Sequence, residues 1–286
     1  MSEATAQRPR LPAPSWMIGC GNMGGSIIAG WRSAGVDLSG TVVIRPSGRP
    51  VEGVRTVQSL VDAGAAPKLV VLAFKPQQLD QVAPQLKSWL TSKTVILSIL
   101  AGVEGASLRQ RFPKAGAIVR AMPNLPVAIR RGVIPLYSED ADDAVRQQLA
   151  ELFTPLGFTP WMADEAKFGA VSEVSGAGPA YVARFIAALT KVGEQRGLST
   201  QIASAVALET VLGTAWHAAS SGDTMDEVAR RVASPGGTTE AGLAILDRDA
   251  VLDQLIAVTV DAASRREQEL AQAAKLASLA GEPQLN

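Results

Sequence analysis

The chain has 286 residues, a formal net charge of zero at pH 7 and 47% apolar residues, which is typical of a water-soluble protein with room for two domains. This balance excludes a strongly basic nucleic-acid-binding protein, and no apolar stretch is long and uninterrupted enough to cross a membrane. A single cysteine and the lack of a basic, apolar and cleavable leader lead us to expect a cytoplasmic protein.

The N-terminal part of the sequence opens on an irregular segment and continues into a strand, a helix and a strand. Residues 1–14 are rich in proline and poor in large apolar side chains, so they predict a disordered lead-in. Beyond them the sequence predicts a strand at Trp16–Cys20, a helix at Gly25–Ser33 and a strand at Thr41–Ile44. The first turn between strand and helix carries the motif Gly-x-Gly-x-x-Gly, which begins at Gly19.

This glycine motif has the properties of a pyrophosphate-binding turn. Gly19 permits the tight turn, Gly21 lets the backbone approach phosphate groups, and Gly24 lets the helix pack closely on the strand. Backbone amides and the helix dipole then face the anion. We therefore predict a dinucleotide site rather than an ordinary glycine turn, and we interpret Cys20 within it as a packing residue rather than a nucleophile.

The end of the second strand indicates which dinucleotide binds. Enzymes that use NAD usually have an acidic residue there, whereas this chain has Arg45, Ser47 and Arg49 and no acid before Glu52. Guanidinium and hydroxyl groups suit the 2′-phosphate of NADP. The sequence therefore favours NADPH, with weaker use of NADH, over the alternative of a solvated basic turn.

Further β-rich runs alternate with helical segments up to about residue 163. Four of them are Leu69–Phe74, Val95–Ile99, Ala117–Arg120 and Gly132–Tyr137. Continuous apolar strands with helices between them indicate a buried, mainly parallel sheet. Residues 15–163 are therefore predicted to form an α/β domain of the Rossmann type, with a doubly wound sheet that binds the nucleotide.

Beyond Trp161 the strand signals stop, and residues 164–286 are predicted to form an all-helical C-terminal domain. Its expected helices are Glu165–Ser175, Pro179–Arg196, Thr200–Ser220, Met225–Ala233, Thr239–Leu246 and Ala250–Leu279. Thr200–Ser220 is apolar around nearly its whole circumference, so we expect a second subunit to cover it. His217 on this helix is interpreted as part of that subunit contact rather than as a catalytic residue.

Two loops carry groups that suit ligands. Lys75 follows the strand Leu69–Phe74 and so lies at the carboxyl edge of the sheet, where open α/β folds bind ligands, although an ordinary loop lysine would also fit. Ser234–Thr239 reads Ser-Pro-Gly-Gly-Thr-Thr, and its glycines expose amides at the start of a helix. With three hydroxyl groups beside them, these amides favour a receptor for a small carboxylate over a simple helix cap.

Six motifs in order give the chain a resemblance to the pyrroline-5-carboxylate reductases, and this resemblance covers nearly everything after residue 15. The motifs are Ile18–Gly24, Ala73–Gln77, Ser98–Val103, Arg120–Asn124, Ser175–Tyr181 and Ser234–Thr239. The resemblance implies NADPH-dependent reduction of 1-pyrroline-5-carboxylate to L-proline. It also implies that the helical domain is a dimerisation domain, that the protein is a homodimer, and that a ring of dimers is a further assembly to expect.

The resemblance also implies the residues of the site. Those expected at the cofactor are Ile18, Gly19, Cys20, Gly21, Asn22, Met23, Arg45, Ser47, Arg49, Ala73, Phe74, Lys75, Pro76, Ile99, Leu100, Ala101, Met122, Pro123 and Asn124. Those expected at the cyclic imino acid are Glu165, Ser234, Gly236, Gly237, Thr238 and Thr239. The hydroxyl of Thr239 is implied to meet the ring nitrogen as the catalytic contact, and no metal is expected.

Three positions depart from the family pattern. Ala177 stands in place of a usual serine, Gly169 in place of a common aspartate, and Arg231 in place of an amide. Arg231 is expected either to add a cation near the substrate carboxylate or to narrow the ring pocket. A related imine reductase that acts on another cyclic imino acid therefore stays open as an alternative.

Two further functions fit the sequence less well. A β-hydroxyacid dehydrogenase needs a lysine one turn after a glycine motif on the interdomain helix, and no lysine follows Gly178 there. A non-catalytic NADP-binding sensor would have a damaged substrate loop, whereas Ser234–Thr239 is intact.

Reduction of a protonated C=N bond needs little acid–base chemistry from side chains, which agrees with the absence of a convincing acid–base pair.

Overall fold

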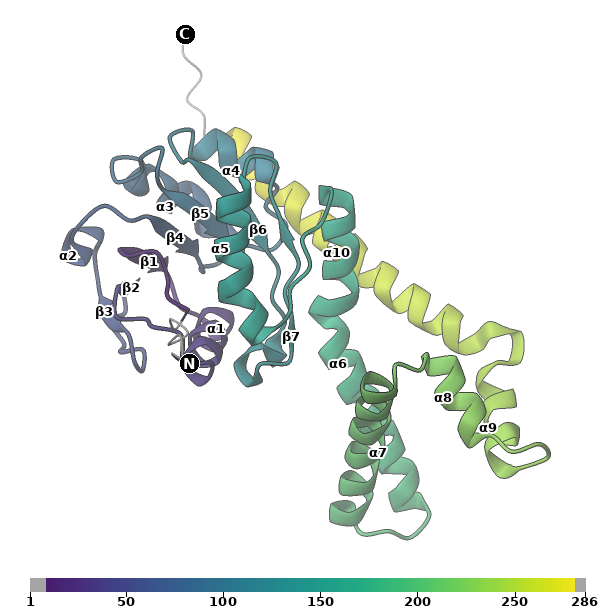
Figure 1. Cartoon of the computed structure of the whole chain (residues 1–286). Coiled ribbons are helices and arrows are strands. Elements are labelled where there is room, and N and C mark those ends of the chain that lie inside the picture. Colours follow the sequence, from purple (N-terminus) through teal and green to yellow (C-terminus); the bar gives the residue numbers. More distant parts are fainter. Residues whose placement is uncertain (1–8, 281–286) are drawn as a thin grey trace. The chain divides into compact units, whose positions relative to one another are not determined.

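The computed structural model describes residues 9–280, and their contacts divide the chain into two compact units (Figure 1). The sheet unit consists of the chain up to Gly176 and of the residues from Ser264 onward. The helical unit is Ala177–Ala263. This division lies inside a helix, whereas the sequence placed the domain boundary at residue 163, where strand signals end. Among residues 9–280, no helix combines the length and apolar character that a membrane span needs.

The sheet unit is built on a seven-stranded sheet with the order β3-β2-β1-β4-β5-β6-β8. The strands are β1 (Ser15–Ile18), β2 (Thr41–Ile44), β3 (Arg55–Val57), β4 (Leu69–Leu72), β5 (Val95–Ser98), β6 (Ala117–Ala121) and β8 (Leu136–Tyr137). Neighbouring strands are parallel except β6 and β8, which confirms the predicted, mainly parallel sheet. The strand order reverses between β1 and β4, and such a switch point opens a crevice at the carboxyl ends of the strands.

Helices cover both faces of this sheet, which confirms the predicted doubly wound fold. The elements are α1 (Asn22–Ser33), α2 (Leu60–Ala63), η1 (Pro76–Gln78), α3 (Leu79–Leu86), α4 (Gly105–Arg111), η2 (Leu125–Ile129), α5 (Asp143–Phe153) and η3 (Thr154–Leu156), where η marks a 3₁₀-helix. One core cluster joins the sheet to α1 and α5, through side chains such as Trp31 and Phe153. The other joins it to α2, α3 and α4, through side chains such as Leu86 and Leu108. Apolar side chains on both faces explain why the strands are apolar without alternation.

Residues 9–14 are ordered, contrary to the disordered lead-in predicted for residues 1–14. Arg10 forms a β-bridge with Asp37, Leu11 is buried, and the carbonyl oxygen of Pro14 accepts a hydrogen bond from the Lys68 amide at 2.8 Å. These backbone and side-chain contacts attach the segment to the sheet unit despite its proline content. Residues 1–8 lie outside the described residues.

The single strand predicted at Gly132–Tyr137 is divided in two. β7 (Gly132–Val133) pairs with β9 (Gly157–Phe158) in a small separate sheet, and β8 pairs with β6. Pro135 lies between β7 and β8 and has no amide hydrogen to contribute to a strand ladder. The proline therefore marks the point at which the chain changes its pairing partner.

The two helices predicted at Glu165–Ser175 and Pro179–Arg196 are one continuous helix, α6 (Glu165–Gln195), with Pro179 inside it. A proline within a helix cannot donate to the carbonyl four residues earlier, which here is that of Ser175. The side-chain amide of Asn124 donates to this carbonyl oxygen instead, at 3.0 Å. A contact from outside the helix thus satisfies the oxygen that the proline leaves without its usual partner.

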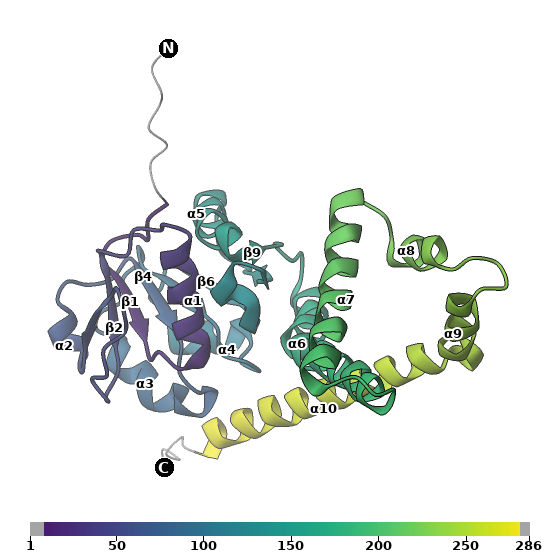
Figure 2. The ribbon, with the colours of Figure 1, turned by 90° about the horizontal axis from the view of Figure 1, so that it is seen from below.

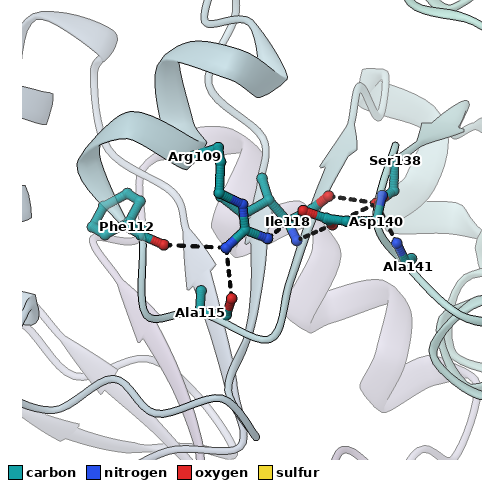
Figure 3. Close-up of polar contacts among 7 residues, drawn as sticks. All are labelled: Arg109, Phe112, Ala115, Ile118, Ser138, Asp140 and Ala141. Carbon is teal, nitrogen blue, oxygen red and sulfur yellow. Dashed lines mark hydrogen bonds and ion pairs between the residues drawn. The ribbon is translucent and has the colours of Figure 1, made fainter.

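An ion pair between Arg109 and Asp140 joins α4 to the segment after β8 (Figure 3). The Arg109 guanidinium also donates to the carbonyl oxygen of Ala115 at 2.6 Å, and Asp140 accepts from the amide of Ile118 at 2.8 Å. Ser138 donates its hydroxyl to Asp140 and accepts from the amide of Ala141. These contacts hold α4 and β6 in place at one side of the sheet.

The helical unit contains the second part of α6, then α7 (Thr200–Ser221), α8 (Met225–Val232), α9 (Thr238–Leu246), η4 (Arg248–Ala250) and the first part of α10 (Val251–Ala280) (Figure 2). All helices predicted after Pro179 are present with small differences at their ends. A Cβ atom at Gly193 would lie 3.0 Å from the Cβ of Ala203, so α6 and α7 pack closely through small residues. Large apolar side chains of α7, such as Leu212 and Trp216, are exposed in the single chain.

Candidate active site

A cavity of about 650 Å³ lies at the carboxyl edge of the sheet, at the switch point of the strand order. It is lined by Gly19, Cys20, Gly21, Asn22, Met23, Gly24, Arg45, Pro46, Ser47, Ala73, Phe74, Lys75, Gln78 and Ile99. The turns that follow β1, β2, β4 and β5 supply these residues. A larger hollow of about 930 Å³ is lined by residues that include Pro9 and Leu152. None of its lining residues is a predicted site residue.

Each glycine of the motif meets the requirement that the sequence placed on it. Gly19 has a φ of +76°, and a Cβ atom there would lie 2.6 Å from the carbonyl oxygen of Ala73. A Cβ at Gly24 would contact Ala73 and Met17 at 3.3 and 3.4 Å, which is the close packing of helix on strand. A Cβ at Gly21 would meet nothing within 4 Å, so this position faces open space. The turn therefore leaves room for a ligand beside the backbone of Gly21.

The first turn of α1 presents unpaired backbone donors at this turn. Its N-cap is Gly21, and no side chain caps the helix or places an acid in its first turn. The first amides of a helix have no acceptor inside the helix, and the helix dipole adds partial positive charge there. The N-terminus of α1 lies against the cavity through Asn22 and Met23 and suits a pyrophosphate.

Arg45 and Ser47 are in contact before any ligand is considered. The Nε of Arg45 donates to the Ser47 hydroxyl at 2.9 Å, and both residues line the cavity. Arg49 is exposed and does not line it, although its backbone amide lies 3.5 Å from the same hydroxyl oxygen. Two of the three residues predicted at the 2′-phosphate therefore line the cavity. Pro46 also lines it and was not among the predicted residues.

The thiol of Cys20 is buried beside the glycine turn. Burial raises the pKa of this thiol, and the positive charge of Arg45 lowers it by a smaller amount. A raised pKa keeps the sulfur protonated and unreactive at neutral pH. The thiol therefore behaves as the packing residue that the sequence predicted.

Lys75 and Gln78 close the cavity from the turn after β4. Lys75 is exposed, and its backbone amide donates to the side-chain oxygen of Gln78 at 3.3 Å. Pro76 starts the 3₁₀-helix η1, which fixes this turn, and does not itself line the cavity. Gln78 was missed by the sequence analysis because the motif was followed only as far as Gln77.

Other residues predicted at the cofactor lie outside the cavity wall. These are Ile18, Arg49, Pro76, Leu100, Ala101, Met122, Pro123 and Asn124. Ile18 and Leu100 are buried in the core of the sheet. The Asn124 side chain bonds to Ser175 and also accepts from the Val133 amide at 2.8 Å, so it joins three segments of the sheet unit. Their contact with a cofactor stays a prediction.

Glu165 is engaged within the sheet unit. Its Oε1 accepts from Arg120 Nη1 at 2.5 Å and from the Gly105 amide at 2.9 Å. Arg120 is buried at the end of β6 and lies over the Phe168 ring, with 4.5 Å from Cζ to the ring centroid. This pair fastens the start of α6 to the carboxyl edge of the sheet. Arg120 was missed as an individual site residue, although the motif quoted at that point begins with it.

The loop Ser234–Thr239 lies in the helical unit and leads into α9. The N-cap of α9 is Gly237, and no side chain caps the helix. The Gly237 amide donates to the carbonyl oxygen of Ser234 at 2.9 Å, and the Gly236 amide donates to the Glu240 carboxylate at 2.6 Å. Thr238 and Thr239 occupy the first positions of the helix, where amides have no acceptor within the helix.

Arg231 does not stand free beside this loop. It forms two contacts with Asp223, at 2.8 and 3.0 Å, and His217 lies 3.8 Å from the same carboxylate. A hydrogen bond from Ser221 lowers the pKa of Asp223 most, and the charges of Arg231 and His217 lower it further. The Arg231 guanidinium is therefore already paired with a carboxylate of the chain. A Cβ atom added at Gly169 would have no neighbouring atom of the described residues within 4 Å.

No group of three or more residues able to hold a metal ion occurs within residues 9–280.

Comparison with known proteins divides the chain much as its composition does. Residues 16–102 match a family model described as NADP oxidoreductase coenzyme F420-dependent, and residues 165–270 match one described as pyrroline-5-carboxylate reductase dimerisation.

Whole-chain comparisons agree with these matches. A pyrroline-5-carboxylate reductase of Pseudomonas aeruginosa is 37% identical over 89% of this chain and 96% of its own length. A solved structure of a Coxiella burnetii pyrroline-5-carboxylate reductase is 31% identical, covers 91% of this chain and 99% of its own, and has a TM-score of 0.83. A Plasmodium falciparum pyrroline carboxylate reductase with NADP bound shares the fold, with 23% identity over 91% and 98% of the two chains and a TM-score of 0.80. With a glycine-lined cavity at its switch point and this likeness along nearly its full length, the chain belongs to the pyrroline-5-carboxylate reductase family.

Proposed function

We propose that the protein reduces 1-pyrroline-5-carboxylate to L-proline with NADPH. The observation that carries the proposal is the cavity in which the glycine turn, Arg45 and Ser47 meet, in a chain of this family. The Coxiella and Pseudomonas relatives are named for this activity. By the same proposal, the protein is an oxidoreductase that acts on a C=N bond.

The residues of the cavity fit NADPH group by group. Open space at Gly21 and the uncapped start of α1 suit the pyrophosphate, and the Arg45 guanidinium with the Ser47 hydroxyl suits the 2′-phosphate. Phe74 and Ile99 supply apolar wall beyond the phosphates. The cofactor supplies the hydride, and the protein's contribution there is to bind and orient it.

On the substrate side, Ser234–Thr239 is proposed to hold the carboxylate through the amides of Thr238 and Thr239. The hydroxyl of Thr239 is proposed to orient the ring nitrogen and, for an imine that enters unprotonated, to pass a proton to that nitrogen. Correct positioning of two reactants can supply a large part of the rate gain in such a reaction. Glu165 is proposed as a further residue near the substrate, and its ion pair with Arg120 holds the two side chains in position within the sheet unit.

A homodimer is proposed as the working form, with a ring of dimers as its further assembly and the cytoplasm as its compartment. The family model for dimerisation covers residues 165–270, and exposed apolar side chains occur along α6, α7 and α10. A related imine reductase acting on another ring is the second candidate, because Ala177 and Arg231 depart from the family pattern.

Oxidation of NADPH tests the proposal and its alternatives in one experiment. The purified protein is supplied with 1-pyrroline-5-carboxylate or with piperideine-carboxylate, and separately with 3-hydroxyisobutyrate and NADP. We expect the highest kcat/KM with the five-membered ring. A higher kcat/KM for the six-membered ring would select the related imine reductase, and turnover of the hydroxy acid alone would select the dehydrogenase.

A further inference from the structure

A carboxylate of the chain itself occupies part of the loop that is proposed to bind the substrate carboxylate. Glu240 lies in the first turn of α9, and its Oε2 accepts from the Gly236 amide at 2.6 Å. Gly236 has a φ of +70°, a conformation that side chains rarely adopt, so this turn requires glycine. The Gly237 amide is also engaged, by the carbonyl oxygen of Ser234.

We infer that Glu240 determines affinity and specificity at this loop, because its carboxylate competes with the carboxylate of the ligand. The inference rests on the proposed function. Glu240 carries the same chemical group as the substrate and bonds to one amide of the same loop. Of the amides at the start of α9, those of Thr238, Thr239 and Glu240 then stay available to an incoming anion.

A ligand with a carboxylate has two ways to bind under this arrangement. It displaces Glu240 from the Gly236 amide, or it binds beside Glu240 and experiences the repulsion of a like charge a few ångströms away. Glu240 is exposed, so water and salt screen this repulsion and keep the effect to a several-fold change. A ring without a carboxylate has no anion for Glu240 to compete with or repel, so removal of the Glu240 charge does not improve its binding.

A purely structural role for Glu240 predicts a different result. A glutamate at the third position of a helix commonly bonds back to the residues before the helix and stabilises its start. Glutamine keeps a side-chain oxygen able to accept from the Gly236 amide, but it removes the negative charge. Glu240→Gln therefore retains the cap and tests the charge alone.

The experiment compares wild type with Glu240→Gln in the intact protein. Asp247→Asn is the matched control, since it removes a carboxylate at the other end of the same helix. The kinetic measurements are KM for 1-pyrroline-5-carboxylate and kcat/KM for 1-pyrroline, which lacks the carboxylate. Calorimetry with proline and with prolinamide measures binding without turnover.

We expect Glu240→Gln to lower KM for 1-pyrroline-5-carboxylate and Kd for proline by about two- to ten-fold, as the removal of an exposed like charge predicts. Affinity for prolinamide and kcat/KM for 1-pyrroline should not improve, because these ligands lack the carboxylate and are cations when the ring nitrogen is protonated. All values of the control should stay unchanged. Unchanged proline affinity, or equal shifts for proline and prolinamide, would overturn the role of Glu240. Failure of the wild type to reduce 1-pyrroline-5-carboxylate would instead refute the proposed function.

Discussion

The Arg45 guanidinium and the Ser47 hydroxyl are held together at the edge of the cavity, so a phosphate would meet two donors already in place. Preorganised donors lose less entropy when a ligand binds. Arg49 is on the same turn but outside the cavity wall, which the sequence pattern alone did not distinguish. This difference between two arginines makes the cofactor assignment testable.

Arg45→Ala should raise KM for NADPH about ten-fold or more and leave KM for NADH nearly unchanged. A hydrogen bond to a charged group contributes about 1.5 to 3 kcal/mol, and NADH has no 2′-phosphate to lose it. Steady-state kinetics with both cofactors measure the effect, and Arg49→Ala is the control, with a smaller expected change. Equal losses for both cofactors in Arg45→Ala would contradict the phosphate site.

Thr239→Val should lower kcat/KM for the imine by roughly ten- to a thousand-fold, in the range of acid–base and positioning contributions. Valine has nearly the same shape as threonine and lacks the hydroxyl, so the amides at the start of α9 remain. Binding of NADPH, followed by its fluorescence, should stay near wild type. Full activity in Thr239→Val would place the nitrogen contact elsewhere.

At the level of secondary structure, α6 is continuous because a contact from the sheet unit compensates for Pro179. Asn124 donates to the Ser175 carbonyl oxygen, the acceptor that the proline cannot serve. The Asn124 side chain is buried and joins η2, β7 and α6. Asn124, which was predicted at the cofactor, therefore has a structural role that the motif alone does not reveal.

Asn124→Ala should lower the free energy of unfolding by about 2 to 4 kcal/mol, since it leaves a buried carbonyl and a partly buried amide without partners. Pro179→Ala restores a backbone donor for Ser175, so its benefit should be about 1 kcal/mol larger in the Asn124→Ala background than in wild type. Urea unfolding of the four proteins at one concentration measures this coupling. Strict additivity of the two changes would argue against the compensation.

At the level of the whole molecule, a single chain leaves much apolar surface on its helical unit. Exposed side chains there include Val182, Phe185, Leu189, Ile202, Val206, Leu208, Leu212, Trp216, Leu255 and Ile256. Such a concentration is unusual on the surface of a monomer and indicates a contact with another chain. The hydrophobic character of α7 on all sides, noted in the sequence, has this physical meaning.

Trp216→Glu should convert the homodimer to monomers at micromolar concentration, because the substitution places a charge in an apolar contact. Light scattering measures the mass, and activity should fall with the loss of the dimer. Val61→Glu is the control, since Val61 is a large, exposed apolar residue on α2 of the sheet unit, with 76% of its surface accessible. A Trp216→Glu protein that stays dimeric would place the contact on another face.

Local sequence patterns were sufficient to predict the alternation of strands and helices, the glycine turn and the apolar character of α7. These features depend on local patterns: a period in the hydrophobic residues, or a glycine that one turn requires. Three features instead depend on the folded chain: Pro179 lies inside a helix, Arg120 pairs with Glu165, and Arg231 pairs with Asp223. The first two depend on partners 51 and 45 residues apart, Asn124 with Ser175 and Arg120 with Glu165, which no local pattern relates. The third depends on the corner between α7 and α8, which brings the two charged side chains together.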